Sequence, residues 1–271
     1  MILGLVFMYS RVQALATNTS AGVTRRSRGV AFASPPGRSF GTLLATSPPA
    51  KKEMAFRMAD GSQITCRIVD SGSLLSVYVD ADYDLPGTDW DSVDTVIDVG
   101  AHVGSFTVWV ARRAPRARIV AVEPNPQSFH LLERNIRLNG LSDRVRTINA
   151  AVGAEAGRVA FESSEHSLGT KMSTQGNGAL MADVFRLADL IQESGFNTVD
   201  YLKLDTEGME YQILKHADAG VLRQIRRLTC EYHPVAGESV QALADQLEAA
   251  GYSVGRTHGT VGVIWATRLQ R

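Results

Sequence analysis

The chain has 271 residues and a hydrophobic content of 44%, which suits one large α/β domain with appendages and would be cramped for two domains. Its 28 lysine and arginine residues balance 28 aspartate and glutamate residues, so no global basic field favours nucleic acid or an anionic membrane. No stretch approaches the roughly 20 apolar residues of a membrane span. We therefore expect a small or neutral partner, and the sequence gives no indication of oligomeric state.

Residues 1–52 contain no acidic residue, and their arginines alternate with serine, threonine, glycine and proline. Such a segment cannot bury much apolar surface, so we expect a disordered basic extension. A transit peptide, a secretory signal ending near Ala14–Ala16 and a misassigned start codon are the alternatives. The protein is accordingly expected in the cytoplasm, or in an organelle if the segment is a transit peptide.

Residues 53–92 are expected to form a β-hairpin and a loop. Two strands are predicted at 63–69 and 74–79, because turn residues separate two short apolar runs. Residues 83–90 follow as a loop rich in aspartate, proline and glycine.

Residues 93–271 show the alternation of strands and helices that predicts one α/β domain. Strands are expected at 95–99, 118–122, 145–152, 158–161, 199–204, 227–231, 252–255 and 261–266. Helices are expected after the turn at 100–104, from Pro126 behind an Asn125 cap, and at 186–194, 209–216 and 239–250. The pattern favours a doubly wound, mostly parallel sheet, and the last two strands, which lack an intervening helix, predict an antiparallel C-terminal edge.

The first of these strands carries an acid and leads into a turn between two glycines. Gly100 would let the backbone pass close to a ligand, Gly104 would let the next helix pack tightly, and free amides in the turn could hold a carboxylate. Asp98 beside this turn suits a cationic amino group better than a pyrophosphate. The spacing also departs from the dinucleotide pattern G-x-G-x-x-G, so NAD is disfavoured.

Glu123 ends the second strand, where an acid can accept hydrogen bonds from both ribose hydroxyls of a nucleoside. Its alternative role is to cap the following helix, but Asn125 already fills that position. Asp98 and Glu123 together predict a ligand with a cationic amino group and a ribose.

Several separated motifs resemble those of the FkbM-like family of S-adenosylmethionine-dependent methyltransferases. The similar segments are residues 96–104, 121–124, 150–153, 187–190 and 201–210. The resemblance implies a class I, Rossmann-like methyltransferase fold, S-adenosylmethionine as cofactor, and methylation of a hydroxyl oxygen on a small metabolite or sugar. We expect His102, Asn149 and Ala151 to join the cofactor site; the family usually has asparagine in place of His102.

Methyl transfer from a sulfonium is an in-line displacement, and a hydroxyl acceptor must also lose its proton. Asp205 and Glu207 follow one core strand, and Glu231 and His233 end the next, at the carboxyl edge where open α/β sheets bind ligands. We expect Asp205 and Glu207 to organise the acceptor, and His233 or one of those two acids to act as base. Glu210 is expected to be structural.

Several alternatives stay open. Asp205, Glu231 and His233 could ligate a divalent ion, although their spacing is not diagnostic and no metal is our preferred expectation. His166 and the loop 163–178 could form an acceptor lid. A cofactor-binding protein without catalysis, a nucleotide-dependent oxidoreductase, and a methyltransferase acting on nucleic acid or protein are the competing functions.

Overall fold

The computed structural model describes residues 53–85, 87–162, 171–172 and 180–269. The expected basic extension, His166 and most of the loop expected at 163–178 lie outside the described residues. Within the described part, no helix is both long and apolar enough to cross a membrane.

The N-terminal unit contains the expected hairpin, but with different strands. β1 (Glu53–Arg57) pairs antiparallel with β2 (Gln63–Arg67), and a turn through Gly61 joins them. The prediction of a strand at 74–79 was wrong, because these residues lie in helix α2 (Ser71–Tyr78), which follows the short 3₁₀ helix η2 (Ile68–Asp70). The buried side chains of α2, Leu74 and Val77, are three residues apart, which is a helical spacing.

The outer edge of β2 is bonded to side chains of helix α4 (Pro126–Leu138) and its C-cap. The Asn139 side chain accepts a hydrogen bond from the Gln63 backbone N–H (2.9 Å) and donates one to the Gln63 backbone carbonyl (2.7 Å). Asn135 does the same for Thr65, with both distances 2.8 Å. Four helical residues rise about 6 Å and two strand residues about 6.6 Å, so the two asparagines match alternate residues of β2.

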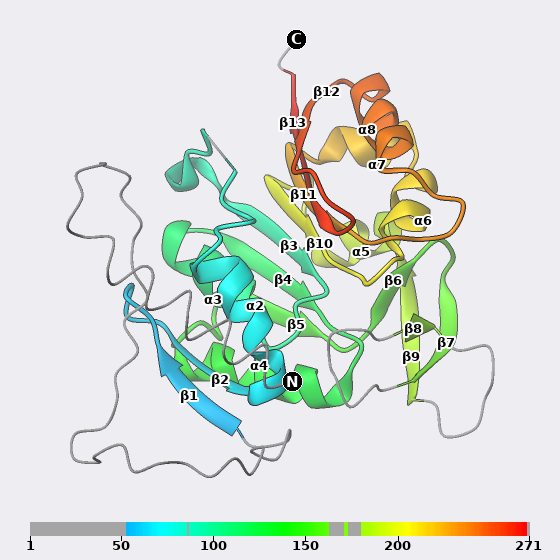
Figure 1. Cartoon of the computed structure of the whole chain (residues 1–271). Helices are drawn as coiled ribbons and strands as arrows, with labels where there is room; N and C mark the ends of the chain where they lie inside the picture. Colours follow the sequence, from blue (N-terminus) through cyan, green and yellow to red (C-terminus); the bar gives the residue numbers. More distant parts are fainter. Residues whose placement is uncertain (1–52, 86, 163–170, 173–179, 270–271) are drawn as a thin grey trace, which may run out of the picture.

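The central sheet has seven strands in the order β12-β13-β11-β10-β3-β4-β5 (Figure 1). Their bounds are β3 Thr95–Val99, β4 Arg118–Val122, β5 Val145–Ile148, β10 Tyr201–Leu204, β11 Arg227–Tyr232, β12 Tyr252–Arg256 and β13 Gly262–Arg268. Five of these strands run parallel, namely β3, β4, β5, β10 and β11. β13 is antiparallel to both β11 and β12. The expected doubly wound, mostly parallel sheet with an antiparallel C-terminal edge is therefore confirmed.

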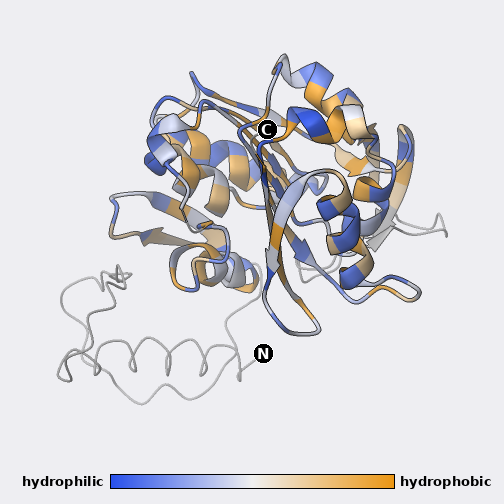
Figure 2. Ribbon diagram, turned by 90° about the horizontal axis from the view of Figure 1, so that it is seen from above, coloured by the Kyte–Doolittle hydropathy of each residue, from blue (hydrophilic) through white to orange (hydrophobic). Residues whose placement is uncertain are grey.

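Helices cover both faces of this sheet. Alternate strand residues belong to different hydrophobic clusters: Val96 packs with α2, α3 (Ser105–Arg113) and α4, whereas Ile97 packs on the other face. The helices of that second face are α5 Leu187–Ser194, α6 Glu210–Lys215, α7 Ala219–Gln224 and α8 Val240–Ala249. Figure 2 shows that helices on both sides mix hydrophobic and hydrophilic residues, as expected for helices with one buried face.

A second sheet lies beside the carboxyl edge of the first. Its order is β6-β9-β7-β8, with β6 Ala151–Gly153, β7 Gly157–Glu162, β8 Lys171–Met172 and β9 Leu180–Arg186 (Figure 1). The single strand expected at 145–152 is in fact two strands in two sheets. The chain turns between them at Asn149, whose side chain donates to the backbone carbonyls of Glu123 (2.7 Å) and Pro124 (3.1 Å).

Candidate active site

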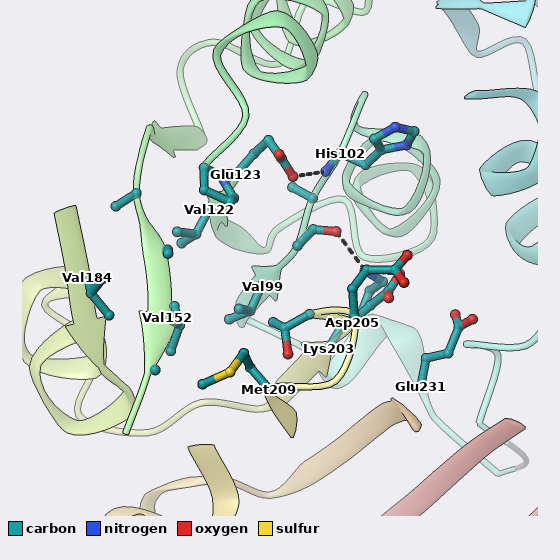
Figure 3. Close-up of a pocket in the computed structure, with 18 of the residues that line it drawn as sticks. Val99, His102, Val122, Glu123, Val152, Val184, Lys203, Asp205, Met209 and Glu231 are labelled. Atoms are coloured by element: carbon teal, nitrogen blue, oxygen red, sulfur yellow. Dashed lines mark hydrogen bonds and ion pairs between the residues drawn. The ribbon is translucent and has the colours of Figure 1, made fainter. Parts of the chain in front are cut away.

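A cavity of about 800 Å³ opens at the carboxyl ends of β3, β4, β10 and β11. The N-terminal unit contributes Ser73, Ser76 and Tyr83 to its wall. Figure 3 shows the apolar side chains of Val152 and Val184, from the second sheet, on the side opposite Asp205 and Glu231. The cavity thus has one apolar side and one acidic side.

The turn after β3 requires glycine because it touches the end of β10. Gly100 has φ of +75°, and a Cβ atom there would lie 1.7 Å from the Asp205 carbonyl oxygen. Gly104, with φ of +87°, precedes α3, and a Cβ atom there would lie 2.8 Å from a methyl carbon of Leu132. Gly104 therefore has the close-packing role that the sequence predicted, whereas Gly100, which was expected to approach a ligand, is required by its contact with the Asp205 backbone.

His102 holds the turn in place through both its backbone and its side chain. Its backbone amide donates to Glu123 Oε2 (2.9 Å), and its ring Nε2 lies 3.3 Å from Asp70 Oδ1 (Figure 3 shows the ring directed away from Glu123). The buried Asp70 also accepts two hydrogen bonds from the Arg67 guanidinium. His102 lines the cavity, and its ring ties the turn to the N-terminal unit.

Glu123 lies at the end of β4, where the sequence placed it, and lines the cavity. Its Oε1 accepts from the Asn125 amide (2.8 Å), which fixes the carboxylate beside the His102 amide. Burial raises the pKa of Glu123 despite these two bonds and the nearby charge of Lys203. Asn125 caps α4 through the Gln127 amide, as expected.

Asp98 is fully buried and is not among the described residues that line the cavity. Its carboxylate accepts from Thr107 Oγ1 (2.5 Å) and lies 3.3 Å from Lys203 Nζ. Lys203, a residue that sequence reasoning missed, donates to the Gly100 carbonyl (3.0 Å) and lies 3.4 Å from Asp205 Oδ2. The expected acid is thus present beneath the turn, and Lys203 connects it to the cavity wall.

Lys203 is held as a cation. Burial alone would lower its pKa, but the carboxylates of Asp98, Asp205 and Glu231 outweigh burial and raise the pKa to about 12. The ammonium also lies 5.1 Å from the centre of the Tyr83 ring.

The two residues expected near the end of the third strand have different positions. Ala151 lines the cavity, as do its neighbours Ala150 and Val152. Asn149 is not among the described lining residues, and its amide instead supports the backbone that carries Glu123.

The loop after β10 is organised by Glu210, which is fully buried. Its carboxylate accepts from the backbone amides of Thr206 (2.7 Å) and Gly208 (2.9 Å), and from the ring of His233 (3.3 Å). Glu207 between them has φ of +54°, and its Oε2 lies 3.5 Å from His233 Nε2. Glu210 is therefore structural, as expected.

Of the three residues expected to be catalytic, Asp205 and Glu207 line the cavity and His233 is not among the described lining residues. Burial lowers the pKa of His233, but the hydrogen bond to Glu210 and the charges of Glu210, Glu207 and Asp205 outweigh burial and raise it to about 9. Burial and the Asp205 charge raise the pKa of Glu207.

Tyr83 and Glu231 form a contact across the acidic side that the sequence did not predict. The Tyr83 hydroxyl donates to Glu231 Oε2 (2.6 Å) and lies 3.4 Å from Asp205 Oδ2. Tyr201 Oη donates to the Tyr83 backbone carbonyl (2.5 Å), and the ring of Tyr83 packs edge-on against Phe106. Tyr83 follows α2, so only the folded N-terminal unit brings it to the end of β11.

Asp205, Glu231 and His233 each offer a possible metal-ligand atom, and these atoms lie within 4.8 Å of one another. However, Lys203 already pairs with Asp205, and Tyr83 already donates to Glu231. These contacts would have to give way before an ion could bind, so a site without metal stays our expectation.

Comparisons with known proteins identify the family of the chain. Residues 98–254 match the methyltransferase FkbM domain family. The chain is 26% identical over 214 residues to methyltransferase sdnD of Sordaria araneosa, covering 66% of this chain and 81% of sdnD. It is also 26% identical over 210 residues to the 31-O-demethyl-FK506 methyltransferase FkbM of Streptomyces tacrolimicus, covering 66% of this chain and 80% of the relative. The solved METTL16 methyltransferase domain aligns with a TM-score of 0.47 at 15% identity, covering 73% of this chain and 68% of that one.

Proposed function

From the membership of this chain in the methyltransferase FkbM domain family, which makes it a methyltransferase, we infer that the cavity binds S-adenosylmethionine and that a hydroxyl oxygen of a small metabolite or sugar receives the methyl group. The acceptor class is supported by the relative that is named as an O-demethyl-FK506 methyltransferase. The expected neutral partner agrees with the balanced charge of the chain.

The residues that line the cavity suit the chemistry of this cofactor. The observation that supports this proposal most directly is the contact between the Gly100 turn and Asp205. This contact brings the turn, Glu123 and the acidic side together around the cavity. Glu123 offers carboxylate oxygens for ribose hydroxyls. The side formed by Val152 and Val184 suits an apolar, flat ring system.

The charge of the cavity also suits a cation. Acidic residues outnumber lysine and arginine among the described lining residues: Glu123, Glu155, Asp205, Glu207 and Glu231 against Arg158 and Lys203. S-adenosylmethionine carries a net positive charge and supplies an activated methyl group on its sulfonium sulfur. The pyrophosphate of a dinucleotide would be repelled by the same acids.

The protein contributes orientation and proton removal. We assign Asp205 and Glu207 to positioning the acceptor, because both line the cavity next to the Gly100 turn. His233, whose pKa is raised to about 9, holds a proton near neutral pH and is assigned to fixing Glu207 and Glu210. The buried ion pair of Lys203 and Asp98 helps to keep these groups in place, which favours in-line transfer.

Calorimetric titration with S-adenosylhomocysteine, NAD and NADP tests the cofactor. We expect binding of S-adenosylhomocysteine alone, with a matching rise in thermal stability of about 2.7 kcal/mol at a hundredfold excess over its dissociation constant. Binding of NAD or NADP without S-adenosylhomocysteine would refute the proposal. Incubation with radiolabelled S-adenosylmethionine and a panel of sugars and hydroxylated metabolites, with and without chelator, then tests the acceptor class and any need for a metal.

A further inference from the structure

We propose that Glu231 is the catalytic base that takes the proton of the acceptor hydroxyl, with Tyr83 as the residue that positions its carboxylate. This proposal rests on the proposed function, since it names the proton acceptor for the same transfer. The sequence placed Glu231 at the carboxyl edge of the sheet without assigning it as the base, and it did not single out Tyr83.

The position of Glu231 suits this role. Glu231 is the penultimate residue of β11, lies beside Asp205, lines the cavity, and has about a quarter of its side chain exposed. The Tyr83 hydroxyl binds one oxygen, Oε2, at 2.6 Å. The other oxygen, Oε1, lies 3.8 Å from His233 Nε2, beyond hydrogen-bond distance, so it keeps capacity for a proton from the acceptor.

The neighbouring groups already have partners or a proton. Asp205 Oδ2 lies 3.4 Å from the Lys203 ammonium and 3.4 Å from the Tyr83 hydroxyl. His233 already carries a proton near neutral pH, because its pKa is raised to about 9. Glu210 has its oxygens filled by backbone amides and by His233.

Glu231 has the properties that these neighbours lack. Burial, followed by the charge of Asp205, raises its pKa to about 7, while Tyr83, Lys203 and His233 limit the rise. A base works best when its pKa lies near the working pH. Tyr83 cannot accept the proton itself, because burial and the nearby carboxylates raise its pKa well above the usual value and its hydroxyl therefore stays protonated.

The step balances as follows. The acceptor O–H bond breaks as its proton forms an O–H bond with Glu231, and the oxygen forms the new bond to the methyl carbon. The electron pair of the broken C–S bond stays on sulfur, which becomes a neutral thioether. Glu231 then returns the proton to solvent through the open side of the cavity.

The test uses Glu231→Gln, Tyr83→Phe and, as a matched control, Glu248→Gln on the exposed face of α8. All are first titrated with S-adenosylhomocysteine, and we expect each variant within about threefold of the wild type, since a general base contributes to rate rather than to cofactor binding. If the wild type does not bind S-adenosylhomocysteine, the proposed function is refuted. The infrared measurement then tests separately whether Glu231 carries a proton near neutral pH.

Infrared spectra are then recorded from pH 5 to pH 9, about 2 pH units either side of neutrality, to show which carboxyl group carries the proton. A protonated-carboxyl C=O band should fade near pH 7 in the wild type and in Glu248→Gln. It should be absent from Glu231→Gln, and it should persist to higher pH in Tyr83→Phe, because the lost hydrogen bond stabilised the ionised form. Glu123 and Glu207 also have raised pKa values and can contribute bands of their own, so the decisive band is the one lost in Glu231→Gln. A band near pH 7 that is unchanged in Glu231→Gln, or no such band in the wild type, would overturn the proposal.

Methylation of phenol and of 4-nitrophenol gives the catalytic readout. Both are assayed at a pH above the pKa of 4-nitrophenol and below that of phenol. Glu231→Gln should then lose about 10²- to 10⁴-fold in kcat on phenol, and much less on 4-nitrophenol, which is largely ionised before it binds. Equal rates of wild type and Glu231→Gln on phenol would overturn the assignment. If the wild type accepts neither phenol, the infrared result decides.

Discussion

The ammonium of Lys203 lies 3.3 Å from the carboxylate of Asp98 beneath the cavity, and less than a tenth of either residue is exposed. The register of the sheet pairs these two residues directly on β10 and β3. Lys203→Met would leave a buried carboxylate without its cation, which typically costs about 3–5 kcal/mol. Urea unfolding followed by circular dichroism measures the loss.

The double variant Lys203→Met, Asp98→Asn separates charge from packing. It removes the uncompensated charge as well as the ammonium, so we expect it to recover a large part of the lost free energy of unfolding. A double variant as unstable as Lys203→Met would show that packing, rather than the charge pair, accounts for the effect.

Gly100→Ala should abolish cofactor binding and destabilise the fold. The added methyl group would lie 1.7 Å from the Asp205 carbonyl, at a φ of +75° that alanine rarely adopts. The strand ends must therefore separate, which opens the cavity floor. Thermal melting and S-adenosylhomocysteine titration check both effects, and Gly61→Ala is the control, since it has a similar φ of +85° with nothing within 4 Å. Equal losses in the two variants would attribute the defect to φ alone.

Glu123→Gln should weaken S-adenosylhomocysteine binding by about 10- to 100-fold, the effect of losing one charge-assisted hydrogen bond. The glutamine carbonyl oxygen can still accept from the His102 backbone, although the Asn125 backbone N–H then loses its acceptor, so the turn is expected to persist. Calorimetry gives the affinity, with Glu248→Gln again as the control. Unchanged affinity in Glu123→Gln would remove this residue from the ribose site.

The stability of the acidic side should depend on pH through His233. Its pKa is raised from 6.5 to about 9 in the folded protein, so protonation favours folding. The contribution is fully present below pH 6.5 and is lost as the pH rises through about 9. Urea midpoints across this window should fall more steeply for the wild type than for His233→Gln, and parallel curves would contradict the assignment.

The parallel core strands and the glycine turn could be predicted because they depend on local patterns, whereas the order of the strands across the sheet could not. Continuous apolar runs mark the buried parallel strands, and Gly100 and Glu123 follow two of them directly. Helix α2 was misread because a run of six residues with four apolar side chains fits a strand or a helix equally well. β9 was missed, although its pairing with β6 shapes the apolar side of the cavity.

Lys203 and Tyr83 could not be found from sequence for a different reason. A lysine inside an apolar strand gains its role only from the register that places it opposite Asp98. Tyr83 reaches Glu231 only because the N-terminal unit packs across α3, and nothing local to a loop tyrosine indicates a partner so distant in the chain.

The asparagines on α4 have a consequence for the behaviour of the protein at high concentration. One edge of β2 pairs with β1, and along the other edge the peptide groups of Gln63 and Thr65 are all bonded to Asn139 and Asn135. An uncovered strand edge recruits strands from neighbouring molecules. The helix therefore shields the β2 edge of the hairpin, and replacing both asparagines with leucine would leave the peptide groups of that edge available to a strand from another molecule.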